Sequence, residues 1–201
     1  MSSKSKPKAS GSCATVSRTS SGEARVSDVC LPSSSRLSVR NYHPSDLDSV
    51  ISIFLRAIRE IACNDYSPAQ INAWAQVDRA AWAKRRLSRP TWVAVLKQEL
   101  VGFADLEPDG HLDMMFVHPA HQGVGVATLL LMTVETSASR QRLSRIFTEA
   151  SITARPFFER RGFSVVARQE VSKRGQRLTN FRMEKHLAKD PLHDRHKHAQ
   201  A

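Results

Sequence analysis

The stretch 111–132 combines an apolar segment, a turn that contains two glycines, and a second apolar segment. Its first part, 111–117, has the length and composition of a largely buried strand. Pro119 then disfavours helix in the residue before it, and Gly123 and Gly125 precede a segment that is expected to be helical. The first amides of a helix have no partner within it and lie at the positive end of its dipole. The turn is therefore predicted to bind a phosphate or pyrophosphate.

Three phosphate-binding motifs can be compared with this turn. A P-loop ends in Gly-Lys-Ser/Thr, where this chain has Gly-Val-Ala. A dinucleotide-binding fingerprint ends in a third glycine, where this chain has Thr128. Residues 122–127 instead satisfy the pattern Gln/Arg-x-x-Gly-x-Gly/Ala at every position. The stretch thus resembles the cofactor-binding turn of the GNAT acetyltransferases, and a glycine turn without a ligand is the alternative.

Other parts of the chain support this resemblance. Residues 154–163, Ala-Arg-Pro-Phe-Phe-Glu-Arg-Arg-Gly-Phe, are similar to the family's Ala-x-x-Phe-Tyr-Glu-x-x-Gly-Phe. Residues 66–74, 150–154 and 179–181, together with Asp-Met at 113–114, resemble a bacterial YafP-type branch of the family.

The resemblance covers residues 37–187 and implies a GNAT fold of the α/β (α+β) class. Such a fold has a mixed, mostly antiparallel central sheet that is splayed between its fourth and fifth strands and flanked by helices. Hydrophobic periodicity predicts the same order of elements, with strands at 37–42, 91–96, 100–106, 111–117, 145–150, 163–169 and 177–184, and helices at 43–62, 68–75, 78–87, 127–132 and 152–161.

The resemblance also implies acetyl-CoA as the donor of an acetyl group to an amine. It places the pantetheine arm along the fourth strand and the pyrophosphate at the glycine turn. It puts Ser151 where the family often has an asparagine facing the cofactor, and Phe158 where it often has a tyrosine. The residues implied in cofactor binding are Met115, Phe116, Val117, Gln122, Gly123, Val124, Gly125, Val126, Ala127, Ser151 and Phe158.

The chemistry of amine acetylation requires a group that takes up a proton. A lysine-like amine has a pKa of about 10.4 and attacks a thioester only when neutral, so a carboxylate is expected near it, acting directly or through water. Asp113 lies two residues before Met115 in the predicted strand, so both should lie on one face. Glu149, near the end of the next strand, is the second candidate. For Asp113, a surface hydrogen bond at a strand end is the alternative.

The leaving thiolate raises a separate question, because Phe158 has no proton to give. Tyr66 is another candidate donor, since the helix it precedes lines the acceptor side in this family. A half-buried core tyrosine is its alternative. The thiolate could also take a proton from water or leave without one, because a free thiol has a pKa of about 8.5.

Composition limits the other functional classes. The formal net charge of +11 permits attraction to nucleic acid, but the chain has no helix-turn-helix, zinc-finger or RNP pattern. No apolar run approaches the roughly 20 residues of a membrane span. Cys13, Cys30 and Cys63 form no disulfide framework, which favours a reducing cytoplasm. No metal site is expected, because no acid or cysteine completes one among the histidines of the C-terminal tail.

Three segments are predicted. Residues 1–36 form a basic, serine-rich segment expected to be disordered, with a targeting peptide and an over-extended start as alternatives; residues 37–187 form the acetyltransferase domain; residues 188–201 form a polar, histidine-rich tail. The leading hypothesis is an acetyl-CoA-dependent enzyme, monomeric or homodimeric, that acetylates the primary amine of a small molecule. A GNAT-fold CoA-binding sensor without transfer activity, and a nucleic-acid-associated basic protein, are the alternatives.

Overall fold

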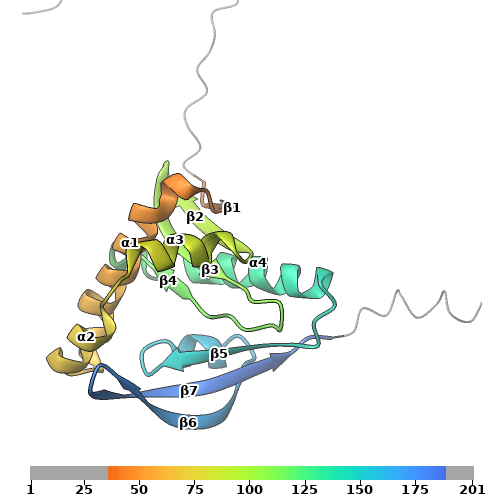
Figure 1. The fold of residues 1–201 in the computed structure, drawn as a ribbon. Helices are drawn as coiled ribbons and strands as arrows, with labels where there is room; N and C mark the ends of the chain where they lie inside the picture. Colours follow the sequence, from red (N-terminus) through yellow and green to blue (C-terminus); the bar gives the residue numbers. More distant parts are fainter. Residues whose placement is uncertain (1–35, 189–201) are drawn as a thin grey trace, which may run out of the picture. The chain divides into compact units, whose positions relative to one another are not determined.

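The structure is a computed structural model that describes residues 36–188, so most of the predicted terminal segments 1–36 and 188–201 lie outside it. Two antiparallel sheets form the frame of the described part (Figure 1). The first has the order β1-β2-β3-β4, with β1 Ser38–Asn41, β2 Thr91–Leu96, β3 Glu99–Asp105 and β4 Met115–Val117. The second has the order β5-β7-β6, with β5 Arg145–Ser151, β7 Gln176–His186 and β6 Ser164–Lys173.

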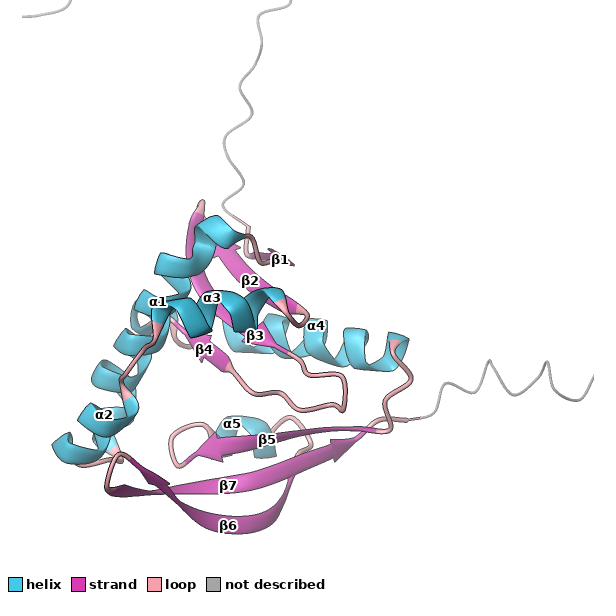
Figure 2. Cartoon of the chain, in the orientation of Figure 1, coloured by secondary structure: helices cyan, strands magenta, loops and turns pink. Residues whose placement is uncertain are grey.

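Helices cover both faces of the first sheet, with α4 on one face and α1 and α3 on the other (Figure 2). Their bounds are α1 Leu47–Arg56, α2 Pro68–Trp74, α3 Arg79–Leu87, α4 Val126–Arg140 and α5 Arg155–Glu159. Shorter helical turns are η1 Pro44–Asp46, η3 Ala62–Asn64 and η4 Pro119–His121, and a wider π-type turn, η2, spans Ala57–Ile61. The predicted order of elements is therefore confirmed. None of the helices in residues 36–188 is long and apolar enough to cross a membrane.

Local sequence accounts for the start of α2 and for the β6–β7 turn. Ser67 Oγ accepts the amide of Gln70 at 3.3 Å and Gln70 Oε1 accepts the amide of Ser67 at 2.8 Å, a capping box that begins α2 with Pro68 in its first turn. In the hairpin, Arg174 and Gly175 have φ of 47° and 78°. Positive φ at both central residues is typical of the tight turns that match the twist of paired strands.

The core has one cluster on each face of the first sheet. Leu130 and Val134 of α4 are fully buried on one face, and Val50 and Ile53 of α1 are buried on the other. Full burial of such a side chain contributes about 1.5–3 kcal/mol. Gly102 of β3 lets α4 approach closely, because an added Cβ would lie 2.8 Å from a methyl carbon of Val126.

The two sheets are joined at one end of β4 and β5. The amide of Leu112 donates to the carbonyl of Phe147 at 2.8 Å, and the amide of Phe147 donates to that of Gly110 at 3.0 Å. Beyond this point β4 pairs with β3, and no described strand pairs with its other edge. The predicted splay between the fourth and fifth strands is therefore confirmed.

Several predicted boundaries were wrong. The helix expected at 127–132 extends to Arg140, and the strand expected at 163–169 extends to Lys173. The fourth strand begins at Met115 and not at residue 111, because Leu112 pairs toward β5 and the side chain of Asp105 takes the amide of Met114 at 2.9 Å in place of a ladder bond. The fifth helix is shorter than the predicted 152–161. Ser151 Oγ accepts the amide of Ala154 at 3.1 Å, which holds residues 151–154 in a turn, so that α5 begins at Arg155.

Candidate active site

A cavity of about 220 Å³ lies where β4 and β5 diverge. All three residues of β4 line it on one side, and residues 148–151 of β5 line it on the other. The wide turn η2 supplies Ala57, Ile58 and Ile61 to its wall. Of the residues expected from the sequence, the lining includes Asp113, Met115, Phe116, Val117, Gln122, Ala127, Glu149, Ser151 and Phe158.

The glycine turn lies beside this cavity and begins α4. Gly123 and Gly125 have φ of 76° and 91°, and a Cβ added at either would meet nothing within 4 Å. Gly125 is the residue that precedes the first turn of α4, whose first amides have no partner within the helix. Val124 between them is 56% exposed. The turn therefore presents bare main chain to open space at the positive end of a helix of 15 residues.

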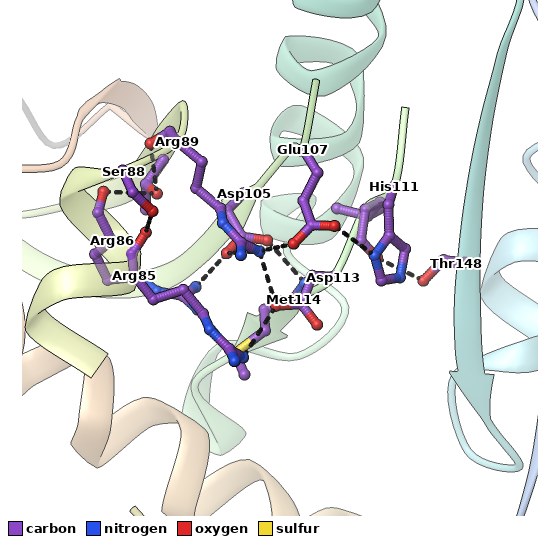
Figure 3. A network of polar contacts seen from close by, with 12 residues as sticks. Arg85, Arg86, Ser88, Arg89, Asp105, Glu107, His111, Asp113, Met114 and Thr148 are labelled. Carbon is purple, nitrogen blue, oxygen red and sulfur yellow. Dashed lines mark hydrogen bonds and ion pairs between the residues drawn. The ribbon is translucent and has the colours of Figure 1, made fainter. Parts of the chain in front are cut away.

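Asp113 lines the cavity but is engaged by two guanidinium groups (Figure 3). Its Oδ2 lies 3.0 Å from Nη1 of Arg89 and 3.5 Å from Nη1 of Arg85. Both arginines come from α3 and the loop that follows it. Oδ2 of Asp113 is thus held by an ion pair with Arg89 and by a longer one with Arg85.

Glu149 has a different partner. His111 Nε2 lies 2.6 Å from Glu149 Oε2, and His111 Nδ1 lies 3.0 Å from Glu107 Oε2. The imidazole ring stacks on Phe147, with 4.9 Å between ring centroids and 10° between planes. Burial lowers the pKa of His111, but the hydrogen bonds to Glu107 and Glu149 outweigh it, so the pKa is raised overall.

A buried ion pair lies next to these groups, because Asp105 Oδ2 is 3.8 Å from Nη1 of Arg89. Arg86 Nη1 lies 2.5 Å from Asp105 Oδ2, and both side chains are fully buried. The Arg86 guanidinium also lies over the rings of Trp82 and Phe103. Burial raises the pKa of Asp105 to about 6, although the positive charge of Arg86 opposes the change. Burial also disfavours the charged form of Arg86, and therefore lowers the pKa of its guanidinium.

Comparison with known proteins decides the family. Residues 62–185 match the family model described as an acetyltransferase (GNAT) domain. This chain belongs to the GNAT acetyltransferase family. The N-acetyltransferase YafP of Escherichia coli (strain K12) is 41% identical over 147 residues, which are 73% of this chain and 94% of YafP. The expected resemblance to the YafP-type branch is therefore confirmed.

Solved GNAT structures agree with the fold. A GCN5-related N-acetyltransferase from Rhodopseudomonas palustris is 37% identical, with a TM-score of 0.72 over 75% of this chain and 95% of that one. YncA of Salmonella typhimurium, solved with acetyl-CoA, is 22% identical, with a TM-score of 0.58 over 77% of this chain and 96% of that one.

Phe158 and Tyr66 occupy different places in this GNAT domain. Phe158 is buried at the cavity wall, where its ring packs edge-on against Phe157 and Phe163. Tyr66 is not among the residues that line the cavity. Its Oη donates to the carbonyl of Thr179 at 2.6 Å and accepts the amide of Ile152 at 3.0 Å, and burial raises its pKa. The hydroxyl proton of Tyr66 is thus held by a main-chain acceptor.

His111 was not predicted as a site residue from the sequence. It lies two residues before Asp113, within the segment predicted as a strand, and was assigned no role. Its partners Glu107 and Glu149 are 4 and 38 residues away along the chain. The signal in the sequence is a histidine four residues after an acid in a turn, which by itself does not distinguish a site from a surface ion pair.

Proposed function

We propose that this GNAT enzyme transfers the acetyl group of acetyl-CoA to the primary amine of a small molecule. The observation that carries the proposal is a cavity between splayed strands with the bare glycine turn at one side and the carboxylates of Asp113 and Glu149 at its wall. Acetyl-CoA would supply an activated thioester. Its presence in the YncA structure supports the choice of donor.

The residues around the cavity fit such a donor. Residues 122–127 would hold the pyrophosphate through main-chain amides, since Gly123 and Gly125 leave the approach open. The edge of β4 that pairs with no described strand would hold the pantetheine arm, along Met115–Val117. Ser151 and Phe158 line the cavity beside it. Phe158 offers apolar surface and no proton, so a proton for the departing thiolate would come from water.

Glu149 is our choice for the group that takes the proton of the attacking amine. Sequence analysis favours Asp113, but two arginines hold its carboxylate and its side chain is 22% exposed, whereas the side chain of Glu149 is 36% exposed and has a single imidazole as its ion-pair partner among the described residues. Glu149 contacts His111 through Oε2, and its other oxygen could accept a proton directly or through a water molecule. A positioned base of this kind contributes typically about 10²–10⁴-fold to the rate.

The deciding experiment incubates the full-length protein with radiolabelled acetyl-CoA and a panel of small primary amines, with a lysine-containing peptide in parallel. We expect label in at least one small amine. Transfer to the peptide alone would replace the proposed acceptor class. Tight binding of CoA without transfer to any amine would favour the sensor alternative.

A further inference from the structure

We propose that His111, as an imidazolium held between Glu107 and Glu149, is a positioning residue that fixes the Glu149 carboxylate at the cavity wall. The proposal rests on the proposed function, because it assigns a role in that reaction. It starts from the two contacts of the ring, 3.0 Å from Nδ1 to Glu107 and 2.6 Å from Nε2 to Glu149.

The two contacts together set the protonation of the ring. An ionised carboxylate can only accept hydrogen bonds, and a neutral imidazole has a single N–H to donate. His111 therefore satisfies both glutamates only when both of its nitrogens carry protons. A charged donor and a charged acceptor form bonds roughly twice as strong as those of neutral pairs.

Surrounding groups hold the ring in this place. Its face stacks on Phe147 of β5, and the amide of His111 donates to Asp109 Oδ1 at 3.1 Å. Glu107 is held from its other side by Arg89 Nη1, 2.5 Å from Oε1. Arg89 thus holds Glu107 in place beside His111 (Figure 3).

The charged groups that act on His111 come from three segments. Glu107 lies after β3, Asp113 lies in the segment before β4, and Glu149 lies on β5. All three are carboxylates and favour the imidazolium. The pKa of His111 is raised accordingly, against the effect of burial.

The consequence for catalysis depends on pH. Below the raised pKa of His111 the imidazolium donates to both glutamates, so Glu149 is fixed. As the pH rises through that pKa the ring loses a proton, one of the two bonds is lost, and Glu149 gains freedom. Misplacement of a reacting group by about 1 Å can cost about 100-fold in rate.

The first test is NMR of the imidazole nitrogens in the free protein, with the His111 signal assigned from its loss in His111→Gln. We expect both ring nitrogens to be protonated at neutral pH, and the titration midpoint to fall in Glu107→Gln and again in Glu149→Gln. A singly protonated His111 at neutral pH, or a midpoint unchanged in both variants, overturns the proposal. This test needs no turnover, so it stands apart from the proposed function.

The second test compares the turnover rate of the wild type with that of His111→Gln across pH, with an amine found active in the acceptor panel. Glutamine carries its N–H donors on a single nitrogen and has no charge, so like neutral imidazole it cannot donate from two nitrogens to the two carboxylates. Because both proteins act on the same amine, the ratio of their rates cancels the ionisation of that amine. We expect a ratio of about 10–100 below the His111 midpoint that falls toward one above it, with KM for acetyl-CoA unchanged. A ratio that is constant with pH indicates a merely structural role and overturns the proposal. His186→Gln, at an exposed histidine on β7, is the control and should leave the ratio at one.

Discussion

Tyr66, which lies just before α2, and Ile152, which lies just after β5, are joined by a hydrogen bond, since the amide of Ile152 donates to Tyr66 Oη at 3.0 Å. The same hydroxyl donates to the carbonyl of Thr179 on β7 at 2.6 Å. Gln70 and Arg174 add contacts of the same kind, from Gln70 Nε2 to the carbonyl of Arg177 and from Arg174 Nη1 to that of Ala73. Side chain to main chain hydrogen bonds thus join α2 and the segment just before it to β7, to the β6–β7 turn and to the end of β5.

Tyr66→Phe removes both bonds of the hydroxyl and leaves a main-chain amide and a carbonyl without it. We expect the free energy of unfolding to fall by about 1–3 kcal/mol, measured by chemical denaturation, with the turnover rate nearly unchanged. Tyr42→Phe, at the other tyrosine of the chain, is the control and should cost less. Should turnover instead fall by about 100-fold or more while stability stays near that of the wild type, Tyr66 would be supported as the proton donor.

Gly125→Asn places a side chain where the pyrophosphate is proposed to approach. Asparagine tolerates positive φ better than most residues, so the fold should persist while the Kd for CoA, measured by calorimetry, rises at least about 10-fold. Gly175→Asn is a matched control, because Gly175 also has positive φ, 78°, with nothing within 4 Å of an added Cβ. Equal affinities for CoA in the two variants would exclude the turn as the phosphate site.

The two carboxylates of the cavity can be separated by amide substitutions. Glu149→Gln should lower kcat/KM by about 10²–10⁴-fold and leave CoA affinity unchanged. Asp113→Asn should cost less, because Glu149 is the proposed base and the Asp113 carboxylate is held by Arg85 and Arg89. Steady-state kinetics with one active amine provide the measurement. A larger loss in Asp113→Asn than in Glu149→Gln would exchange the two roles.

Asp46 is expected to make stability depend on pH in the acid range. Its carboxylate accepts two bonds from Arg40, at 2.7 and 2.9 Å, and the amide of His43 at 2.8 Å. The hydrogen bonds of Arg40 lower the pKa of Asp46, with burial opposing them. Since the folded-state pKa is lower than the unfolded one, the stabilisation is present above the unfolded value and is lost as the pH falls through the folded value.

Asp46→Asn should therefore lower the free energy of unfolding at neutral pH by about 1.5–3 kcal/mol, the range for hydrogen bonds to charged groups. The difference from the wild type should shrink as the pH falls below about 4. Asp48→Asn is the control: its partner Arg79 is 2.6 Å away, but both side chains are mostly exposed, and such pairs contribute about 0–1 kcal/mol. A penalty in Asp46→Asn that does not vary with pH would contradict the argument.

Features that depend on neighbours in the chain were predictable from the sequence. The glycine turn follows from residue types a few positions apart, and the observed capping box of Ser67 and Gln70 and the turn at 173–175 are local in the same way. Covalent connection keeps such residues close in any conformation, so their preferences act before tertiary packing does. The order of strands and helices follows from hydrophobic periodicity in the same way.

The partners of the cavity carboxylates were decided by tertiary structure alone. Asp113 meets Arg89, 24 residues away, because α3 packs on the first sheet, and Glu149 meets His111, 38 residues away, because β5 joins the segment before β4 at one end. Tyr66 and Ile152, 86 residues apart, meet for a similar reason. No local pattern encodes these contacts, since each depends on how two distant apolar surfaces pack. The sequence by itself thus determined the elements and the glycine turn, and the packing of distant elements determined which charges surround each carboxylate.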